Sequence, residues 1–369
     1  MSGTAVRYKD SVQPVRTDSR DIDRRVAVLT GEAADQQASG TAGEHAQKQA
    51  EVWRNLPQPE ANDPTYYDRP LLNEPVWKWA IPTYDYIGGL TGAALVLGAA
   101  AQIGDTASRE RLIRRCHRIG FAGVVVSAAL LVEDLGKPSR VLNMLRVFRP
   151  TSVMNMGAWI LMGSSVLAFG AFVLRPRKGR LRRVGQFCGY AAGVFGAALA
   201  TYTGVLTGNT AVPLWQASRK ILPILFGVSA MSSVGTLFEL TVESAEERRL
   251  TKLFGTVGQT AELAAEIVME RQAAVVPRVA RPLHRGLGGF LWRSAMLLTG
   301  TGLLLGLTPR HTRNRRIVSG LLGTLGSVLM RFTVEHVGTV SARDARASFH
   351  QQRAGYGAAE VTGRTAAVL

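Results

Sequence analysis

Long apolar runs, separated by short polar or basic stretches, dominate the chain after residue 76. Each run is close to the ~20 residues that an α-helix needs to cross a hydrocarbon core of about 30 Å. The pattern predicts eight spans, at residues 81–103, 115–134, 153–174, 184–206, 221–240, 253–276, 287–307 and 317–334. We therefore expect an all-α fold, a polytopic membrane protein built as a bundle of eight transmembrane helices.

The two ends of the chain have a different composition. Residues 1–76 are polar and mixed in charge, with few large apolar side chains, which predicts a disordered N-terminal tail without a secretory signal. The composition of residues 342–369 predicts a polar C-terminal tail. We assign residues 77–341, between the two tails, to the transmembrane domain. The mean hydropathy of the whole chain is only +0.07, because it averages the polar tails with the apolar runs of the transmembrane domain.

The sixth predicted span is the weakest, because it carries Glu262, Glu266 and Glu270. Their spacing of i, i+4 and i+8 places the three carboxylates on one helix face. On a scale of membrane-insertion free energy, three acidic residues are unfavourable by about 7 to 10 kcal/mol. This exceeds the favourable contribution of the large apolar residues of the span. Either this face turns into the bundle, where it can pair with Arg331 or Arg293 or form a proton path, or the segment lies at the membrane interface.

Basic residues produce the net charge of +17 and sit between the apolar runs. The loops at 109–118, 175–183, 248–252 and 310–316 hold 18 lysines and arginines, against about 10 in the loops at the other ends of the spans. This bias is typical of the positive-inside rule and places the richer loops in the cytoplasm. It argues against a nucleic-acid-binding surface, which would need these residues on a folded domain with groove-reading partners.

The chain offers few ligands for a redox centre. Cys116 and Cys188 are the two cysteines, too few for an iron–sulfur cluster or a cysteine-based zinc site. The six histidines fall in the tails or at the ends of spans and do not form the intramembrane pair that a haem requires. We expect neither haem nor an iron–sulfur cluster in this chain, and no metal site.

Polar residues gather where several spans end on one side of the membrane. Because successive spans alternate in direction, the start of the first span and the ends of the second and fourth reach the same face. A quinone, with a polar head and an apolar tail, would suit such a rim, since tyrosine or asparagine can bond its carbonyls and a carboxylate can relay protons. The alternatives are interfacial aromatic-belt residues, anchors to lipid phosphate and a simple turn cap. The rim residues are Trp79, Asp85, Asp134, Lys137, Arg140, Tyr202 and Asn209.

Four motifs in these regions resemble the NrfD/PsrC family, the membrane subunits of polysulfide-reductase-type molybdoenzyme complexes. The similarity extends over Trp77–Ser341. It implies an eight-span subunit of the bacterial cell (inner) membrane that takes a quinone as its substrate, with menaquinone expected. It also implies an iron–sulfur partner (four-cluster, ferredoxin-like) and a molybdopterin catalytic subunit, and no redox metal in this chain. The motifs are EDLGKPSRVLNMLR (Glu133–Arg146), PTSVMNMGAW (Pro150–Trp159), YTGVLTGNTAVPLW (Tyr202–Trp215) and GLLGTLGSVLMRFTVEHVG (Gly320–Gly338).

The resemblance also implies roles for individual residues. Tyr202 matches the family tyrosine that contacts the quinone head, and Asp134 matches an acidic residue at the same rim. The family often has a histidine or asparagine ahead of the first span; here Asn73 stands there without a histidine, and Trp79 and Asp85 are candidate substitutes. Two other functions stay open: a proton-conducting or transporter subunit that uses the three glutamates, and a passive membrane anchor for a soluble redox enzyme.

Overall fold

The computed structural model describes residues 22–23, 28–29, 71–75, 77, 79–103, 106–135, 138–241, 245–308 and 312–348. The chain divides into two compact units, Met1–Pro64 and Thr65–Leu369. In the first unit, β1 (Ile22–Asp23) pairs antiparallel with β2 (Val28–Leu29). The disorder predicted for residues 1–76 falls almost entirely outside the described residues.

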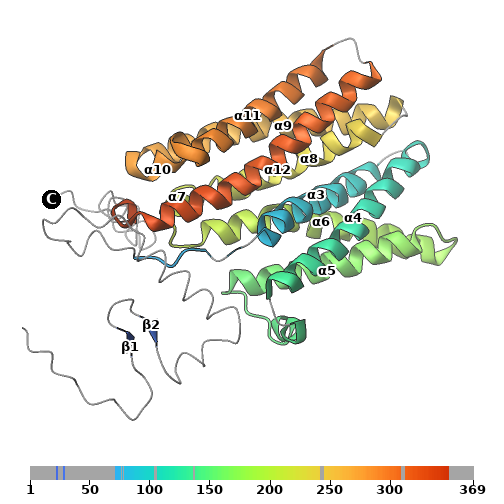
Figure 1. Ribbon diagram of the computed structural model, residues 1–369. Coiled ribbons are helices and arrows are strands. Elements are labelled where there is room, and N and C mark those ends of the chain that lie inside the picture. Colours follow the sequence, from blue (N-terminus) through green and yellow to red (C-terminus); the bar gives the residue numbers. More distant parts are fainter. Residues whose placement is uncertain are drawn as a thin grey trace, which may run out of the picture. The chain divides into compact units, whose positions relative to one another are not determined.

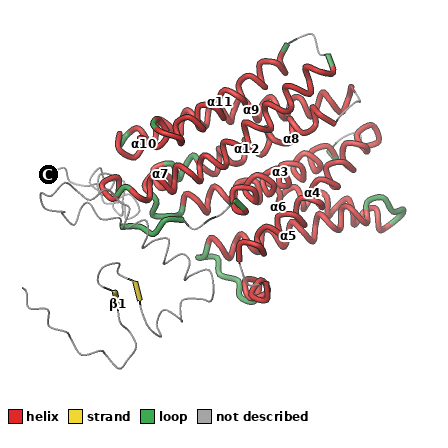
Figure 2. Tube along the Cα trace, viewed as in Figure 1, coloured by secondary structure: helices red, strands yellow, loops and turns green. Residues whose placement is uncertain are grey.

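The second unit is built of helices (Figures 1 and 2). Eight of the helices in its described part have 20 or more residues, and the short η2, α7 and α10 lie in the connections between them. The long helices are α3 (Ala80–Ala101), α4 (Thr106–Leu135), α5 (Val153–Leu174), α6 (Arg180–Gly208), α8 (Leu222–Thr241), α9 (Ala245–Ala274), α11 (Gly286–Leu307) and α12 (Arg313–Arg343). The short ones are η2 (Pro138–Leu145), α7 (Pro213–Ala217) and α10 (Pro277–His284).

The long helices form two groups of four that lie side by side (Figure 1). In the first bundle, α3 packs against α4 and α6, and α5 packs against α6. In the second bundle, α8 packs against α9 and α12, and α11 packs against α12. The two bundles meet where α3 and α6 contact α8 and where α12 contacts α3. We call this contact region the seam.

A close approach of backbones sets the register of α3 against α6. A Cβ atom on Gly92 would overlap the carbonyl oxygen of Gly196 on the neighbouring helix. Small residues of this kind let membrane helices approach closely, so that van der Waals contacts hold them together. Because the two helices run in opposite directions, Asp85, seven residues before Gly92, faces Thr203, seven residues after Gly196.

Large apolar side chains cover the outer surface of the bundles. Phe187 is 70% exposed, Val194 is 73% exposed and Leu297 is 69% exposed. In the described part of the chain, five helices are long and apolar enough to cross a membrane: α5, α6, α8, α11 and α12. The chain is therefore a multi-pass helical membrane protein, and these five helices match five of the eight predicted spans.

The other three predicted spans also coincide with long helices, but their composition is less apolar. Helix α3 carries Asp85, helix α4 begins with a run of arginines, and helix α9 carries the three glutamates. Several helices also extend beyond the apolar runs from which they were predicted. Helix α4 begins at Thr106 and not near residue 115, and α12 continues to Arg343 and not only to residue 334.

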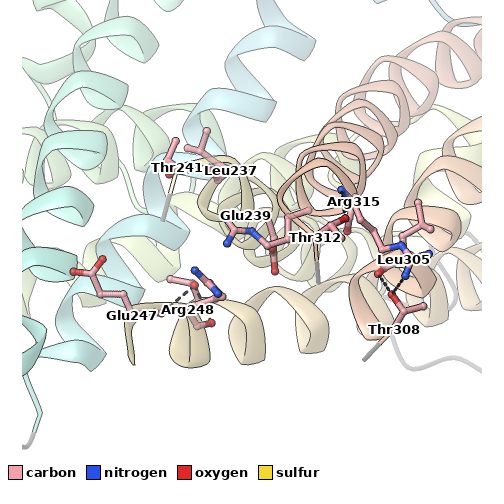
Figure 3. A network of polar contacts seen from close by, with 12 residues as sticks. Leu237, Glu239, Thr241, Glu247, Arg248, Leu305, Thr308, Thr312 and Arg315 are labelled. Carbon is pink, nitrogen blue, oxygen red and sulfur yellow. Dashed lines mark hydrogen bonds and ion pairs between the residues drawn. The ribbon is translucent and has the colours of Figure 1, made fainter. Parts of the chain in front are cut away.

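The arginine-rich ends of the helices are tied together by polar contacts (Figure 3). Thr308 donates its hydroxyl to the Leu305 carbonyl at 2.7 Å, and Arg315 donates to the Thr308 hydroxyl at 3.3 Å, which joins the ends of α11 and α12. Arg115 of α4 lies 3.6 Å from a carboxylate oxygen of Glu247 on α9, a link between the two bundles. We call this the basic end of the protein, and the opposite end, where α3 begins and α6 ends, the rim.

Candidate functional site

A cluster of buried ionisable side chains occupies the seam. It consists of Asp85, Tyr202, Glu262, Arg331 and Glu335, which we call the seam cluster. Asp85 is 3% exposed, Glu262 is fully buried and Arg331 is 1% exposed. Isolated buried charges are strongly unfavourable, so such groups are kept where they pair or perform a function.

Arg331 lies at the centre of the seam cluster. Its Nη2 donates to the Phe226 carbonyl oxygen at 2.7 Å, and its Cζ lies 3.8 Å from the centre of the Phe226 ring. The acidic groups whose charges act on it are Asp85 and Glu262, one from each bundle. Among the described residues no ion pair within 4.0 Å joins the guanidinium to either carboxylate, so it acts on the two bundles at longer range, while a backbone carbonyl and an aromatic face hold it in place.

Tyr202 enters the seam cluster from α6. Its side chain is only 7% exposed, and its ring fills the space over Gly157 of α5, where a Cβ atom would overlap it. The charge of Asp85 acts on Tyr202, and Tyr84 is a neighbour of both. Asp85 and Tyr202, two of the predicted rim residues, are thus brought together inside the protein.

Glu335 extends the seam cluster toward the rim. It follows Arg331 by one turn of α12, about 6 Å along the helix axis, and it too is acted on by the charge of Asp85. Its side chain is 8% exposed, and its Oε1 has no hydrogen-bond partner among the described residues. Sequence reasoning missed Glu335, although the pair Arg331–Glu335, spaced i and i+4 inside an apolar helix, was a usable signal.

The three glutamates of α9 face into the second bundle and not toward the membrane interface. Glu262 accepts hydrogen bonds from the Ser327 hydroxyl at 3.1 Å to each oxygen, and Glu270 accepts one from Trp292 Nε1 at 2.8 Å. Glu266, between them, is fully buried, and neither of its carboxylate oxygens has a hydrogen-bond partner among the described residues. The sequence left open whether this helix face turns into the bundle or the segment lies at the membrane interface. In the structure the face turns into the bundle.

An open pocket lies at the rim, next to the seam cluster. Its volume is about 280 Å³, and its walls come from the segment before α3 and the segment between α6 and α8. We call it the rim pocket; its lining residues are Leu72, Asn73, Glu74, Pro75, Trp77, Thr210, Ala211, Val212 and Trp215.

Two stacked tryptophans form one wall of the rim pocket. The rings of Trp77 and Trp215 lie 5.5 Å apart at an angle of 22°. Trp215 Nε1 donates to the carbonyl oxygen of Val334 at 2.9 Å, which is the residue before Glu335. The rim pocket and the seam cluster are therefore joined through one turn of α12.

An ion pair joins the segment of residues 71–75, which lines the rim pocket, to helix α12. Arg343 donates to both carboxylate oxygens of Glu74, at 2.7 and 2.9 Å. This bidentate geometry is the strong form of an arginine–carboxylate contact. Residues 71–75, which the sequence assigned to the N-terminal tail, thus belong structurally to the helical unit, and Asn73 lines the rim pocket.

The remaining predicted site residues are more scattered. Asp134 is exposed at the end of α4, and Asn209 is exposed at the end of α6, next to Thr210 of the rim pocket. Trp79 is 61% exposed at the start of α3. Lys137 lies outside the described residues. Arg140 belongs to η2, where its side chain is not described.

Comparison with known proteins gives one family. The model of the family described as "Polysulphide reductase, NrfD" matches residues 70–340. A search of curated proteins found no match. The matched segment begins at the rim pocket and ends near the end of α12, so it covers all the long helices.

Proposed function

The chain belongs to the NrfD, polysulphide reductase family, and from this premise we propose that it is the quinone-binding membrane subunit of a respiratory redox complex. The observation that carries the proposal is the rim pocket and its link to the seam cluster, the hydrogen bond from Trp215 in the pocket wall to the carbonyl of Val334, the residue before Glu335. Oxidation of a quinol releases two electrons and two protons, and reduction of a quinone takes them up. A site for this reaction needs a surface for the ring and buried groups that hold protons.

The residues divide between these two tasks. The indole of Trp77, backed by the stacked and fully buried Trp215, offers a flat apolar surface for a quinone ring, and Asn73 offers donors to a ring carbonyl. We assign to the Tyr202 hydroxyl a hydrogen bond to the inner carbonyl of the quinone head, and to Tyr202 and Asp85 together the transfer of protons inward. Electrons leave or enter through an iron–sulfur subunit docked at the rim and reach a molybdopterin catalytic subunit. We propose menaquinone as the substrate and the bacterial inner membrane as the location.

The exposed rim residues keep a supporting role in this proposal. Asp134 provides a second carboxylate at the membrane surface, where protons enter or leave. Trp79 and Asn209 flank the rim, and Lys137 and Arg140 follow Asp134 in the chain. These basic side chains would attract the lipid phosphates or the acidic surface of the partner subunit.

We also propose that α3, α4 and α9 cross the membrane, which makes eight spans. Their charged residues are consistent with crossing, because Asp85, Glu262 and Glu266 face the protein interior and not the lipid. With an even number of spans, α3 begins and α12 ends on one side. The positive-inside rule then places the basic end in the cytoplasm and the rim on the opposite side.

The substitution Tyr202→Phe tests the quinone site. It removes the hydroxyl but leaves the ring over Gly157, so the fold is retained. Loss of one hydrogen bond is expected to weaken binding of a menaquinol-analogue inhibitor roughly five- to tenfold. Quenching of tryptophan fluorescence in the purified full chain measures this binding, because Trp77 and Trp215 line the rim pocket.

A matched control lies on the same helix. Tyr190 donates its hydroxyl to the Gln102 carbonyl at 3.0 Å near the basic end of α6, so Tyr190→Phe should leave inhibitor binding unchanged. Equal binding by wild type and Tyr202→Phe would contradict the assignment of this tyrosine. Failure of the folded wild type, alone and with its partner subunits, to bind the inhibitor would favour a passive anchor.

A second function, proton conduction, is favoured by the buried line of acidic groups. From the seam cluster it continues through Glu266 to Glu270 along one face of α9. Protons taken up or released at a quinone could move along this line. The transporter alternative has no comparable observation in its favour.

Glu266→Gln tests proton conduction separately from folding. Removal of a buried carboxylate without hydrogen bonds should not lower the stability of the protein. The rate of proton uptake by proteoliposomes should fall by about tenfold. Loss of a proton-transfer group that no neighbour can replace would lower the rate by ~10²-fold, but here Glu262 and Glu270 remain. The exposed Glu133 on α4 provides the control, Glu133→Gln. Unchanged uptake in Glu266→Gln would eliminate this path.

A further inference from the structure

A pocket between α4 and α5 at the basic end has no part in the functions above. Its volume is about 240 Å³. We call it the interhelical pocket. Its walls are Arg114, His117 and Arg118 of α4, Ala171 and Phe172 of α5, and Arg175 and Pro176 just after α5.

The spacing of the lining residues explains why they converge. Positions 114, 117 and 118 are separated by three and four residues and share one face of α4. On α5 the lining begins at Ala171 and Phe172 and returns one turn later at Arg175. Two antiparallel helices thus present three arginines and a histidine to the same space.

The charges facing the interhelical pocket are predominantly positive. Glu110 is the acidic group paired there: it lies 2.9 Å from Arg175 Nη2, 3.4 Å from Arg114 Nε and 3.9 Å from Arg182 Nη2. Arg118 has no ion pair in the described part of the chain. One carboxylate is therefore shared by three guanidinium groups, while Arg118 adds a positive charge without an acidic partner among the described residues, and an anionic ligand would restore the balance.

Two buried nitrogen atoms at this pocket also lack partners among the described residues. They are Nε of Arg175, which also donates from Nη1 to Gln102, and Nε2 of His117. Arg175 and His117 are each 2% exposed. Buried polar atoms without partners are uncommon. Since Nε2 of His117 lies next to Gly98 of α3, Nε of Arg175 is the atom that a bound group at the pocket would satisfy.

The surface leading from the interhelical pocket toward the membrane interior is aromatic and apolar. Phe172 stacks on Phe121 with ring centres 5.0 Å apart, and Phe169 lies 5.7 Å from Phe121. Phe169 is 53% exposed and Phe172 36% exposed on the outer surface. A ligand that fits both regions has an anionic head and apolar chains.

We propose that the interhelical pocket binds the phosphate headgroup of an anionic phospholipid, with the acyl chains lying along Phe172 and Phe169. Basic pockets between transmembrane helices at the cytoplasmic side are suited to such headgroups. The phosphate accepts hydrogen bonds from the arginines, and the phenylalanines distinguish a lipid from free phosphate. This site is independent of the proposed quinone chemistry at the rim.

Native mass spectrometry of the full chain, with phosphatidylglycerol added to detergent-purified protein, tests the proposal. Wild type should retain phosphatidylglycerol in preference to phosphatidylcholine. The double variant Arg114→Gln/Arg118→Gln should bind phosphatidylglycerol about 25-fold more weakly, at about fivefold for each arginine near the membrane surface. Arg183→Gln, an exposed arginine outside the pocket, should bind like wild type.

Three outcomes would overturn the proposal. Equal retention of the two lipids would show that the charge of the headgroup is not recognised. Equal binding by the double variant and by Arg183→Gln would place the lipid elsewhere. Displacement of the lipid by an equal concentration of inorganic phosphate would identify a free-anion site. Retention of phosphatidylglycerol against inorganic phosphate, lost only in the double variant, supports the lipid site.

Discussion

Replacement of Asp85 by asparagine is expected to lower quinone-linked turnover by about 10²-fold, the contribution of a positioned proton-transfer group. Asparagine has nearly the same shape, but it cannot take up and release a proton. The fold should survive, because Glu262 still balances the charge of Arg331 and the α3–α6 contact at Gly92 stays intact. Steady-state oxidation of a menaquinol analogue by the assembled complex measures the effect.

Variants of two other carboxylates serve as controls for this prediction. Asp344→Asn removes a partly exposed partner of Arg278, 2.8 Å away and outside the seam cluster, and should leave turnover close to wild type. Asp134→Asn should have a smaller effect than Asp85→Asn, because Asp134 is exposed at the end of α4. If folded Asp85→Asn kept more than half of the wild-type turnover, protons would not pass through this carboxylate.

Replacement of Arg331 by methionine is expected to lower the free energy of unfolding by about 3–5 kcal/mol, the typical cost of removing one partner of a buried ionic network. The loss leaves Asp85 and Glu262 without their shared cation. It also removes the side-chain hydrogen bond to the Phe226 carbonyl oxygen. Thermal unfolding of the purified chain, followed by tryptophan fluorescence, should show a clearly lower Tm.

A control and a rescue sharpen this prediction. Arg293→Met removes an exposed arginine of α11 and should leave the Tm nearly unchanged. The double variant Arg331→Met/Glu262→Gln removes one of the orphaned carboxylates and should recover part of the lost stability, since the two residues belong to one network. A cost below about 1 kcal/mol for Arg331→Met would mean that Arg331 does not hold the seam together.

The long helices could be predicted from the sequence because each apolar run coincides with the middle part of a long helix. Their ends could not, because helices continue into water and headgroups, where apolarity gives no signal. Thus α9 begins at Ala245 and not near residue 253, since charged and polar residues extend it toward the basic end. The short α7 and α10 begin at Pro213 and Pro277, and a proline in the first turn of a helix was the available local signal.

The candidate site was predictable only in part, and for a similar reason. That Asp85 and Tyr202 lie together could be predicted, because both lie near span ends that alternation brings to the same face. The inward face of α9 and the position of Arg331 depend on which helices pack together, and a single sequence does not encode that pairing in any local pattern. The rim pocket needed residues 71–75 to fold back onto α12 through Glu74 and Arg343, a contact between positions 269 residues apart.

The division of the seam cluster between two bundles has a consequence for biogenesis. Arg331 follows Asp85 by 246 residues, so the first bundle is synthesised and inserted well before the cation that faces its carboxylate. Among the described residues, the groups of the first bundle that interact with Asp85 are neutral, namely Thr203, Tyr84 and Tyr202. Insertion of the last helix is therefore the event that brings a cation to Asp85 and completes the charge balance of the seam cluster.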